Sequence, residues 1–341
     1  MTALVEVENL TIRFRTDEGV ITVVENVSFS LNKGEVLGLV GESGSGKSVT
    51  AKALMHLNAG NVLYEPGSKI TLHSGSGPID VLSLASPAEL SVVRGRAVSM
   101  IFQEPMASFA PAITIGAQMV EQLLIHTDMG KRAARKLSIE MLDRVGIKEP
   151  DKRIDQYAFE LSGGMRQRAM IAMALSTKPA LLIADEPTTA LDVTIQAQVI
   201  ELMKGLVDEF GMGILFITHD LGVIAQTADR VAVMYLGRIM ETGPVRNVIR
   251  SPAHAYTRGL INALPKLDDL DAPLTPIPGD IPSPLERPSG CVFHTRNPEL
   301  APGSRYEREV PPLSQIGPGH YAALFPEDVQ QQTAQGEAVT S

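Results

Sequence analysis

An eight-residue segment near the start of the chain has the composition of a phosphate-binding loop. Residues 41–48 fit the pattern G-x-x-x-x-G-K-S, directly after a strand-like apolar run and before a helical pattern. Glycines let successive backbone N–H groups curl around phosphates at the positive end of the helix. Lys47 is expected to neutralise phosphate oxygens and the Ser48 hydroxyl to hold Mg²⁺, and the strand–loop–helix context disfavours the alternative of a turn without a ligand. The residues expected to contact the nucleotide are Gly41, Ser43, Gly44, Ser45, Gly46, Lys47 and Ser48.

Two carboxylates follow a second apolar run. Asp185 and Glu186 come directly after residues 181–184, which are typical of a buried strand, and ligands of open α/β sheets bind at such strand ends. Asp185 is the expected Mg²⁺ partner, through water, and Glu186 is placed to orient or deprotonate an attacking water. Alone, the pair is equally well explained as solvated acids at a strand end. Beside the phosphate loop, the sequence favours a nucleotide-hydrolysing site.

A second segment has the features of an anion site. Ser162, Gly163 and Gly164 precede a helical pattern that starts at Met165. Ser162 is a good N-cap, and the two glycines leave the first N–H groups of the helix open. By itself this pattern indicates no more than a capped helix. A second anion site in a chain with one phosphate loop needs a further explanation.

The elements that must position these residues follow from apolar patterning. Residues 4–12 and 22–31 alternate with period two, which predicts two antiparallel strands. Near-continuous apolar runs suit strands buried on both faces of a parallel sheet; these are 35–40, 98–102, 180–184, 213–217 and 230–234. Helical patterns separate them at 47–57, 115–125, 131–145, 165–176 and 194–210. The predicted fold class is therefore α/β, with a helical insertion before the acid pair.

Composition divides the 341 residues into two parts. Between Pro265 and Pro326 lie 13 of the 23 prolines, a density that predicts extended, poorly regular structure. We expect a main domain over 1–260 and a proline-rich C-terminal extension over 261–341. The polar tail after about residue 330 is expected to be disordered.

Charge and cysteine content exclude several classes of protein. A net charge of −9 argues against a surface that coats nucleic acid. The single Cys291 excludes an intrachain disulfide and fits a reducing compartment. The first ten residues carry two glutamates and no apolar core, so they do not read as a signal peptide. The longest apolar stretch, 169–184, is broken by Lys178 and Pro179, short of the roughly 20 residues that a membrane span needs. The expectation is a soluble cytosolic protein.

The motifs as a set resemble an ABC transporter ATP-binding subunit. In that family 41–48 is the Walker A motif, 161–164 the signature and 181–186 Walker B, and they occur here in family order. Gln103 resembles the Q-loop, Asp192 the D-loop and His219 the H-loop. The resemblance covers about residues 4–240. It implies a P-loop NTPase (RecA-like) core with an antiparallel β subdomain and a helical subdomain over about 105–175. In that family the signature of one subunit faces the Walker A of another and encloses ATP, which would explain the second anion site.

The resemblance also implies single-residue roles. His219 would sense the γ-phosphate, and Gln103 would ligate Mg²⁺ or the attacking water. Asp192 would lie beside the nucleotide in the D-loop. Phe14 resembles the aromatic residue that stacks on adenine, although a lone strand aromatic could equally belong to the core. The catalytic pair is then Glu186 and His219, and the Mg²⁺ ligands are Ser48, Gln103 and Asp185.

Further segments are similar to the oligopeptide/dipeptide importer branch of the family. They are residues 101–111, 161–173, 251–257, 277–282 and 290–291, so the resemblance reaches about residue 300. It implies an ATP-hydrolysing subunit that powers import of peptides or related small solutes. The implied partners are two transmembrane permease subunits, a second ATPase subunit (the same or a related chain) and an extracytoplasmic solute-binding protein. The implied location is peripheral, on the cytoplasmic face of the inner membrane, with no nucleic acid bound.

The sequence is compatible with an alternative function and with an alternative in which the extension binds a metal. The alternative function is a soluble regulatory or repair-type ABC ATPase, which would normally bring a coiled coil, a second cassette or a basic surface. Many members of the peptide branch carry further cysteines in the extension, and a cubane iron–sulfur cluster typically needs four thiolates, whereas this chain has Cys291 alone. His294 and His320 leave a zinc site as a minor alternative. We expect an extension held by apolar and proline-rich packing, with no cluster or other metal.

Overall fold

The smaller of two β-sheets is built from the N-terminal segments. The computed structural model describes residues 3–74, 77–104, 108–188, 193–264 and 276–331. The long strands β1 (Ala3–Thr16) and β2 (Gly19–Asn32) pair antiparallel, which confirms the strands predicted from alternation. The short strands that complete this sheet beside β1 are β4 (Val62–Tyr64), β5 (Lys69–Ser74) and β6 (Gly77–Asp80).

The larger sheet has the order β12-β13-β11-β10-β3-β9-β8-β7 and carries the residues with chemistry at one edge. Its parallel strands are β3 (Val36–Val40), β7 (Val98–Ile101), β8 (Leu181–Asp185), β9 (Gly213–Thr218) and β10 (Arg230–Tyr235). They are buried almost throughout and match the five near-continuous apolar runs. Since parallel strands end at the same edge, the loop after β3 and the residues after β7, β8 and β9 come together.

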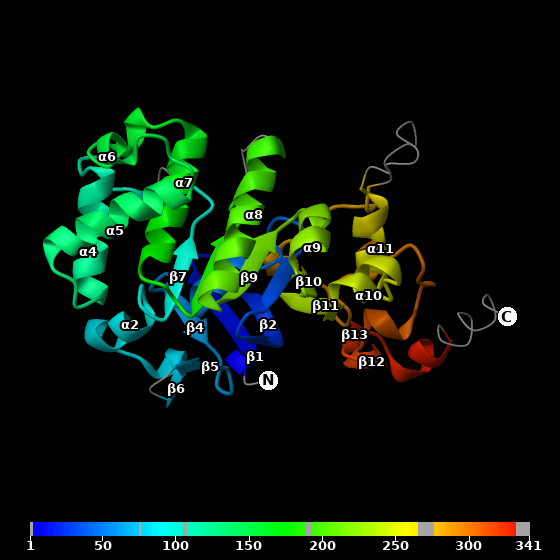
Figure 1. Cartoon of the computed structure of the whole chain (residues 1–341). Coiled ribbons are helices and arrows are strands. Elements are labelled where there is room, and N and C mark those ends of the chain that lie inside the picture. Colours follow the sequence, from blue (N-terminus) through cyan, green and yellow to red (C-terminus); the bar gives the residue numbers. More distant parts are fainter. Residues whose placement is uncertain (1–2, 75–76, 105–107, 189–192, 265–275, 332–341) are drawn as a thin grey trace.

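Helices α4 to α7 separate β7 from β8 in the chain and gather at one end of the molecule, at the upper left of Figure 1. Their bounds are α4 (Ile115–His126), α5 (Lys131–Arg144), α6 (Pro150–Arg153) and α7 (Gly163–Ser176). The other helices are α1 (Lys47–Ala53), α2 (Pro87–Val93), α8 (Val193–Phe210), α9 (Leu221–Thr227), α10 (Val245–Arg250) and α11 (Ala255–Asn262). In the part of the chain that the structure describes, no helix is both long enough and apolar enough to cross a membrane.

Helix α1 is shorter than the prediction of 47–57. His56 adopts a left-handed conformation with φ of +51°. Its amide donates to the Ala53 carbonyl at 3.0 Å, and the Leu57 amide donates to the Lys52 carbonyl at 2.8 Å. This pair of hydrogen bonds is the Schellman closure of a helix end. The helix therefore stops one turn early for a local reason that its apolar spacing does not reveal.

The proline-rich extension is more regular than its composition predicts. Strands β12 (Leu313–Gly317) and β13 (His320–Ala323) form a hairpin, and β13 pairs with β11 (Arg238–Pro244), so the extension lengthens the main sheet. The expectation of poorly regular structure is wrong here, because the hairpin gains its pairing from a strand about 80 residues earlier. The rest of the extension contains the 3₁₀ turns η3 (Pro284–Glu286), η4 (His294–Arg296) and η5 (Arg305–Glu307).

Core packing continues across the expected boundary at residue 260, which falls inside α11. Cys291, Val292 and Phe293 are buried in the same apolar cluster as strands of the main sheet. The Phe293 ring lies 5.3 Å from Tyr235 of β10 and 5.2 Å from Tyr256 of α11, measured between centroids. Aromatic contacts at these spacings stabilise the packing beyond their buried area. These contacts are apolar packing of the kind that was expected to hold the extension.

A buried carboxylate also fastens the hairpin. Glu241 of β11 has no exposed surface, and it accepts hydrogen bonds from the Ala253 amide at 2.9 Å, the His254 amide at 2.9 Å and His320 Nε2 at 2.7 Å. Burial acts to raise the pKa of Glu241, but the hydrogen bonds from His320 and the two amides outweigh it, so the pKa lies below its usual range. A charge satisfied in this way stabilises the fold only while all its donors stay in place.

We therefore expect Glu241→Gln to lower the free energy of unfolding by about 3 kcal/mol, because one amide –NH₂ would face a buried donor. The matched control is Glu299→Gln, whose half-exposed pair with Arg258 is expected to contribute less than about 1 kcal/mol. Because the folded-state pKa of Glu241 is depressed, the wild-type advantage should be complete above its ordinary pKa of 4.5 and shrink as the pH falls further. Urea unfolding at several pH values measures both effects. Equal losses for the two variants would contradict this role.

Candidate nucleotide-binding site

The loop between β3 and α1 has a backbone path that only glycine can follow at two points. Gly41 has φ of +151° and Gly46 has φ of +99°. A Cβ atom on Gly41 would lie 2.0 Å from the Met234 carbonyl oxygen, and one on Gly46 would lie 2.9 Å from the Val23 carbonyl oxygen. The loop is thus pressed against β10 and β2, so a side chain at either position would force the loop or its neighbours to move.

Lys47 places a buried ammonium group inside this loop. The residue is 6% exposed, and Nζ donates to the carbonyl oxygens of Gly41 at 2.7 Å and Glu42 at 2.9 Å. Burial lowers the pKa of Lys47, while the charges of Glu186, Asp185 and Glu42 act to raise it. The direct partners of the ammonium group are neutral carbonyl oxygens. Phosphate oxygens could replace them and would add a negatively charged partner in direct contact with Nζ.

Six of the seven loop residues expected to contact the nucleotide, all but Gly41, line one cavity of about 200 Å³. Its lining consists of Val23, Ser43, Gly44, Ser45, Gly46, Lys47, Ser48, Val49, Gln103 and Glu186. Val23 and Val49 were not expected at the site, and no chemical signal marks them, since they contribute apolar surface alone. The cavity brings the glycine loop together with Gln103 and Glu186 from other strands, whereas His219 is not in its lining and reaches the site through its contact with Glu186.

Asp185 ends β8 and points back at the loop. Its Oδ1 atom accepts a hydrogen bond of 3.1 Å from the Ser48 hydroxyl, and the residue is 4% exposed. Burial raises the pKa of Asp185; the hydrogen bond from Ser48 lowers it, and the neighbouring Glu186 raises it. A buried carboxylate beside a hydroxyl offers the hard oxygen ligands that Mg²⁺ prefers. These residues fit a divalent cation.

Glu186 is held by the ends of two further strands. Its Oε2 accepts from Gln103 Nε2 at 3.1 Å, and its Oε1 lies 3.1 Å from His219 Nδ1. The Glu186 backbone has φ of +47°, a strained conformation for a residue with a side chain, and its amide donates to the Ile217 carbonyl at 2.9 Å. His219 and Gln103 are exposed, whereas Glu186 is mostly covered. The carboxylate therefore has a fixed orientation at the mouth of the cavity.

The candidate anion site at Ser162–Gly164 lies apart from the Lys47 cavity. Ser162 caps α7, with its Oγ accepting from the Met165 amide at 3.4 Å, and Ser162 and Gly163 are exposed. Ser162 and Gly164 line a separate cavity of about 640 Å³ that shares no lining residue with the cavity at Lys47. The helix start is open to solvent, so another molecule can approach it.

Gly41 and Phe14 are expected nucleotide contacts that do not line this cavity. Phe14 lies on β1, paired with Ile21 and Val62, and it packs partly buried against the core of the smaller sheet. It is not among the residues that line the phosphate cavity, and its stacking on adenine stays a prediction. Asp192 lies outside the described residues.

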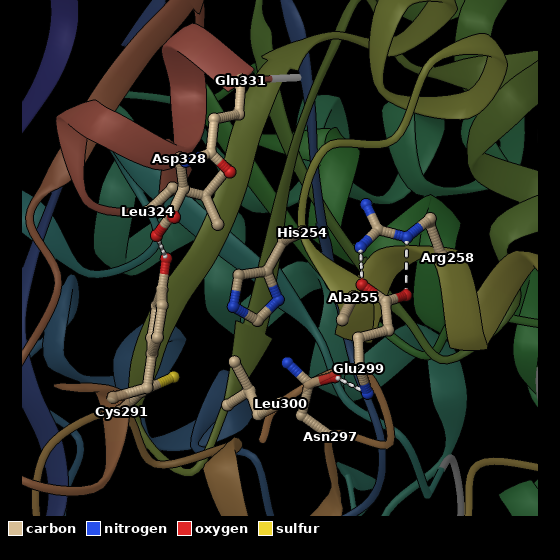
Figure 2. Close-up of a pocket in the computed structure, with 11 residues that line it drawn as sticks. His254, Ala255, Arg258, Cys291, Asn297, Glu299, Leu300, Leu324, Asp328 and Gln331 are labelled. Atoms are coloured by element: carbon tan, nitrogen blue, oxygen red, sulfur yellow. Dashed lines mark hydrogen bonds and ion pairs between the residues drawn. The ribbon is translucent and has the colours of Figure 1, made fainter. Parts of the chain in front are cut away.

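Cys291 lines a cavity of about 390 Å³ between the start of α11 and the extension, shown in Figure 2. His254 points into it, and Arg258 and Glu299 pair across it. The zinc alternative is not assembled there, because His294 Nδ1 lies 2.8 Å from the Cys291 carbonyl oxygen and His320 contacts Glu241. Across the described ranges, no group of three or more His, Cys, Asp or Glu side chains is arranged to hold a metal.

The loop geometry and the acids at the neighbouring strand ends are those of a P-loop NTPase. A family model described as ABC transporter matches residues 24–189, and one described as oligopeptide/dipeptide transporter, C-terminal region, matches residues 240–302. The chain is 46% identical over 330 residues to the oligopeptide transport ATP-binding protein OppD of Bacillus subtilis (strain 168), covering 94% of this chain and 88% of that one. This chain belongs to the ABC transporter family, as one of its ATP-binding proteins.

Two further comparisons agree. A protein of Brucella abortus (strain 2308) described as a peptide import ATP-binding protein is 46% identical over 328 residues, covering 93% of this chain and 95% of its own. The dimeric ATP-binding cassette MJ0796, solved in a post-hydrolysis state with ADP and Pi, superposes with a TM-score of 0.62 at 26% identity, over 71% of this chain and 99% of that one. The family, the fold class and the ATPase activity expected from the sequence are confirmed.

Proposed function

We propose that this chain is the ATP-hydrolysing subunit that powers import of peptides or related small solutes through a membrane ABC transporter. The observation that carries the proposal is the Glu186 carboxylate, held by Gln103 and His219 beside the loop that contains Lys47. The matched C-terminal region and the names of the relatives support the peptide branch. They favour this function over a soluble regulatory or repair-type ATPase.

The residues divide the chemistry between binding and activation of water. The backbone N–H groups of residues 41–48 donate hydrogen bonds to the phosphates of ATP, and Lys47 exchanges its carbonyl contacts for phosphate oxygens. Ser48, Gln103 and Asp185 would hold Mg²⁺, which supplies charge neutralisation at the phosphates. Glu186 orients or deprotonates the attacking water, and Gln103 and His219 fix the direction of its two oxygens. His219, largely exposed, is free to contact the γ-phosphate.

The ATP site is completed by a second ATPase subunit. Within one chain the Ser162–Gly164 segment and the Lys47 cavity have separate linings, so the exposed start of α7 is available to the phosphates held by a neighbour. Ser162, Gly163 and Gly164 would face the γ-phosphate, and Asp192 and Phe14 would complete the nucleotide contacts. The dimeric relative MJ0796 is consistent with such an arrangement.

The subunit works at a membrane through other chains. We infer two transmembrane permease subunits as partners, with an extracytoplasmic solute-binding protein reached through the complex and no nucleic acid bound. The location is peripheral, on the cytoplasmic face of the inner membrane. We propose that the stretch after Gln103, up to about Met119, receives a cytoplasmic helix of a permease; residues 105–107 of this stretch lie outside the described residues. The extension carries no iron–sulfur cluster, because four thiolates are needed and the chain has one cysteine.

Glu186→Gln should bind Mg–ATP with normal affinity yet hydrolyse it about 10²-fold more slowly or worse in the assembled transporter, which is the scale of a lost general base. Lys47→Ala should instead weaken ATP binding itself, because it removes the ammonium that meets the phosphates. Equilibrium binding and steady-state phosphate release separate the two. Near-normal ATPase activity of Glu186→Gln would remove Glu186 from its assigned role.

Ser162→Arg should leave the ATP affinity of the isolated subunit almost unchanged and abolish turnover in the assembled transporter. The reason is that the bulky side chain blocks the start of α7, which serves the neighbour's nucleotide. Thr177→Arg at the other end of α7 is the matched control and should retain turnover. If the isolated Ser162→Arg subunit loses ATP binding, the site is self-contained instead.

The permease contact is best tested by cysteine crosslinking. The native Cys291 is 3% exposed and will not compete. Phe109 is only 4% exposed and belongs to the core, so Ser108→Cys and Ile113→Cys are the better sites. Both should crosslink to a permease in membranes, whereas Val20→Cys on the smaller sheet, 56% exposed, should not. Crosslinks from Ser108→Cys to soluble partners alone would favour the regulatory function.

A further inference from the structure

A residue of the C-terminal extension reaches the phosphate-binding loop. Arg296 ends the turn η4, and its guanidinium forms a two-point ion pair with Glu42, at 2.8 Å from Nη1 to Oε2 and 3.1 Å from Nη2 to Oε1. The two residues are 254 positions apart in sequence. The Arg296 side chain is 5% exposed and that of Glu42 25%. Glu42 is the second residue of the phosphate loop, so this contact joins the extension directly to the ATP site.

The guanidinium of Arg296 is fixed by its other contacts. Nε donates to the Pro278 carbonyl at 2.9 Å, and Nη1 lies 3.4 Å from the Tyr235 hydroxyl. Burial lowers the pKa of Arg296, but the hydrogen bonds to Glu42 and Tyr235 raise it more, so the group stays charged. A planar guanidinium with both outer nitrogens on one carboxylate fixes the carboxylate's direction as well as its position.

Glu42 is held at its backbone as well as at its side chain. Its amide donates to the Tyr256 hydroxyl of α11 at 2.9 Å. Its carbonyl oxygen accepts from Lys47 Nζ at 2.9 Å and from the Ser45 amide at 3.2 Å. Arg296 and Tyr256 thus restrain a residue that contacts both Lys47 and the turn of the loop. Glu42 and Arg296 do not line the phosphate cavity, so they act through their neighbours.

We propose that Arg296 is a positioning residue of the ATP site, which uses its ion pair with Glu42 to hold the first turn of the phosphate loop, and with it Lys47, in the geometry that receives the phosphates. The inference rests on the proposed placement of those phosphates at residues 41–48. A loop that is ordered before ATP arrives loses less conformational entropy on binding, so its affinity for ATP is higher. The extension therefore contributes to nucleotide binding without touching the nucleotide.

The experiment measures Mg–ATP affinity of the purified full chain by calorimetric titration. We expect Arg296→Gln to bind about tenfold more weakly, the scale of a lost residue that supports a direct ligand. Arg258→Gln is the matched control: it breaks a two-point pair with Glu299 in the same region but does not reach the loop, and its affinity should stay within about twofold. In the assembled transporter, Arg296→Gln should raise KM for ATP by a similar factor with little change in kcat.

Two further variants make the result specific. Arg296→Lys keeps the charge but not the two-point geometry, and it should fall between wild type and Arg296→Gln. Glu42→Gln should lose affinity as Arg296→Gln does, and the double variant should lose no more than either alone. Wild-type Mg–ATP affinity in folded Arg296→Gln would overturn the proposal; if that variant does not fold, wild-type affinity in Arg296→Lys and Glu42→Gln would overturn it. Normal affinity in Lys47→Ala would instead remove the phosphate site itself.

Discussion

The buried ammonium of Lys47 is the constraint on which the site depends. A lysine that is 6% exposed has lost most of its water, which destabilises its charged form. The charged form of Lys47 is stabilised by hydrogen bonds to the carbonyl oxygens of Gly41 and Glu42 and by the negative charges of Glu186, Asp185 and Glu42. All of these groups must stay close to Lys47 Nζ. The loop path that achieves this leaves no room for a side chain at Gly41 or Gly46.

The topology of the main sheet positions Glu186 and the two side chains that contact it. Strands β7, β8 and β9 lie side by side and end at one edge, so Gln103, Glu186 and His219 meet although they come from distant parts of the chain. Backbone strain at Glu186 is tolerated because its amide is bound to the Ile217 carbonyl on the adjacent strand. The extension completes the support through β13 at one end of the sheet and Arg296 at the loop. The loop and the sheet are thus supported by parts of the molecule that do not line the phosphate cavity.

Much of this could be predicted from sequence, and the exceptions have a common cause. The phosphate loop, the acid pair and the parallel strands follow from local pattern, and the structure brings Ser48 and Glu186 to one cavity. Gln103, at the same cavity, was expected from the family resemblance alone. The end of α1 at Ala53 depends on a left-handed His56, and the β12–β13 hairpin depends on pairing with β11. The Arg296–Glu42 pair joins residues 254 positions apart. Such contacts arise from tertiary packing, and no spacing in a single sequence encodes them.

The most direct measurement is an experimental structure of the full chain, as Glu186→Gln, with Mg–ATP bound. We predict that Lys47 Nζ moves from the Glu42 carbonyl to phosphate oxygens, while the two-point pair of Arg296 with Glu42 stays in place. We also expect the γ-phosphate of each ATP to lie between residues 41–48 of one subunit and Ser162 of another. Phosphates bound away from the 41–48 loop, or both motifs of one chain closing on the same ATP, would contradict this placement.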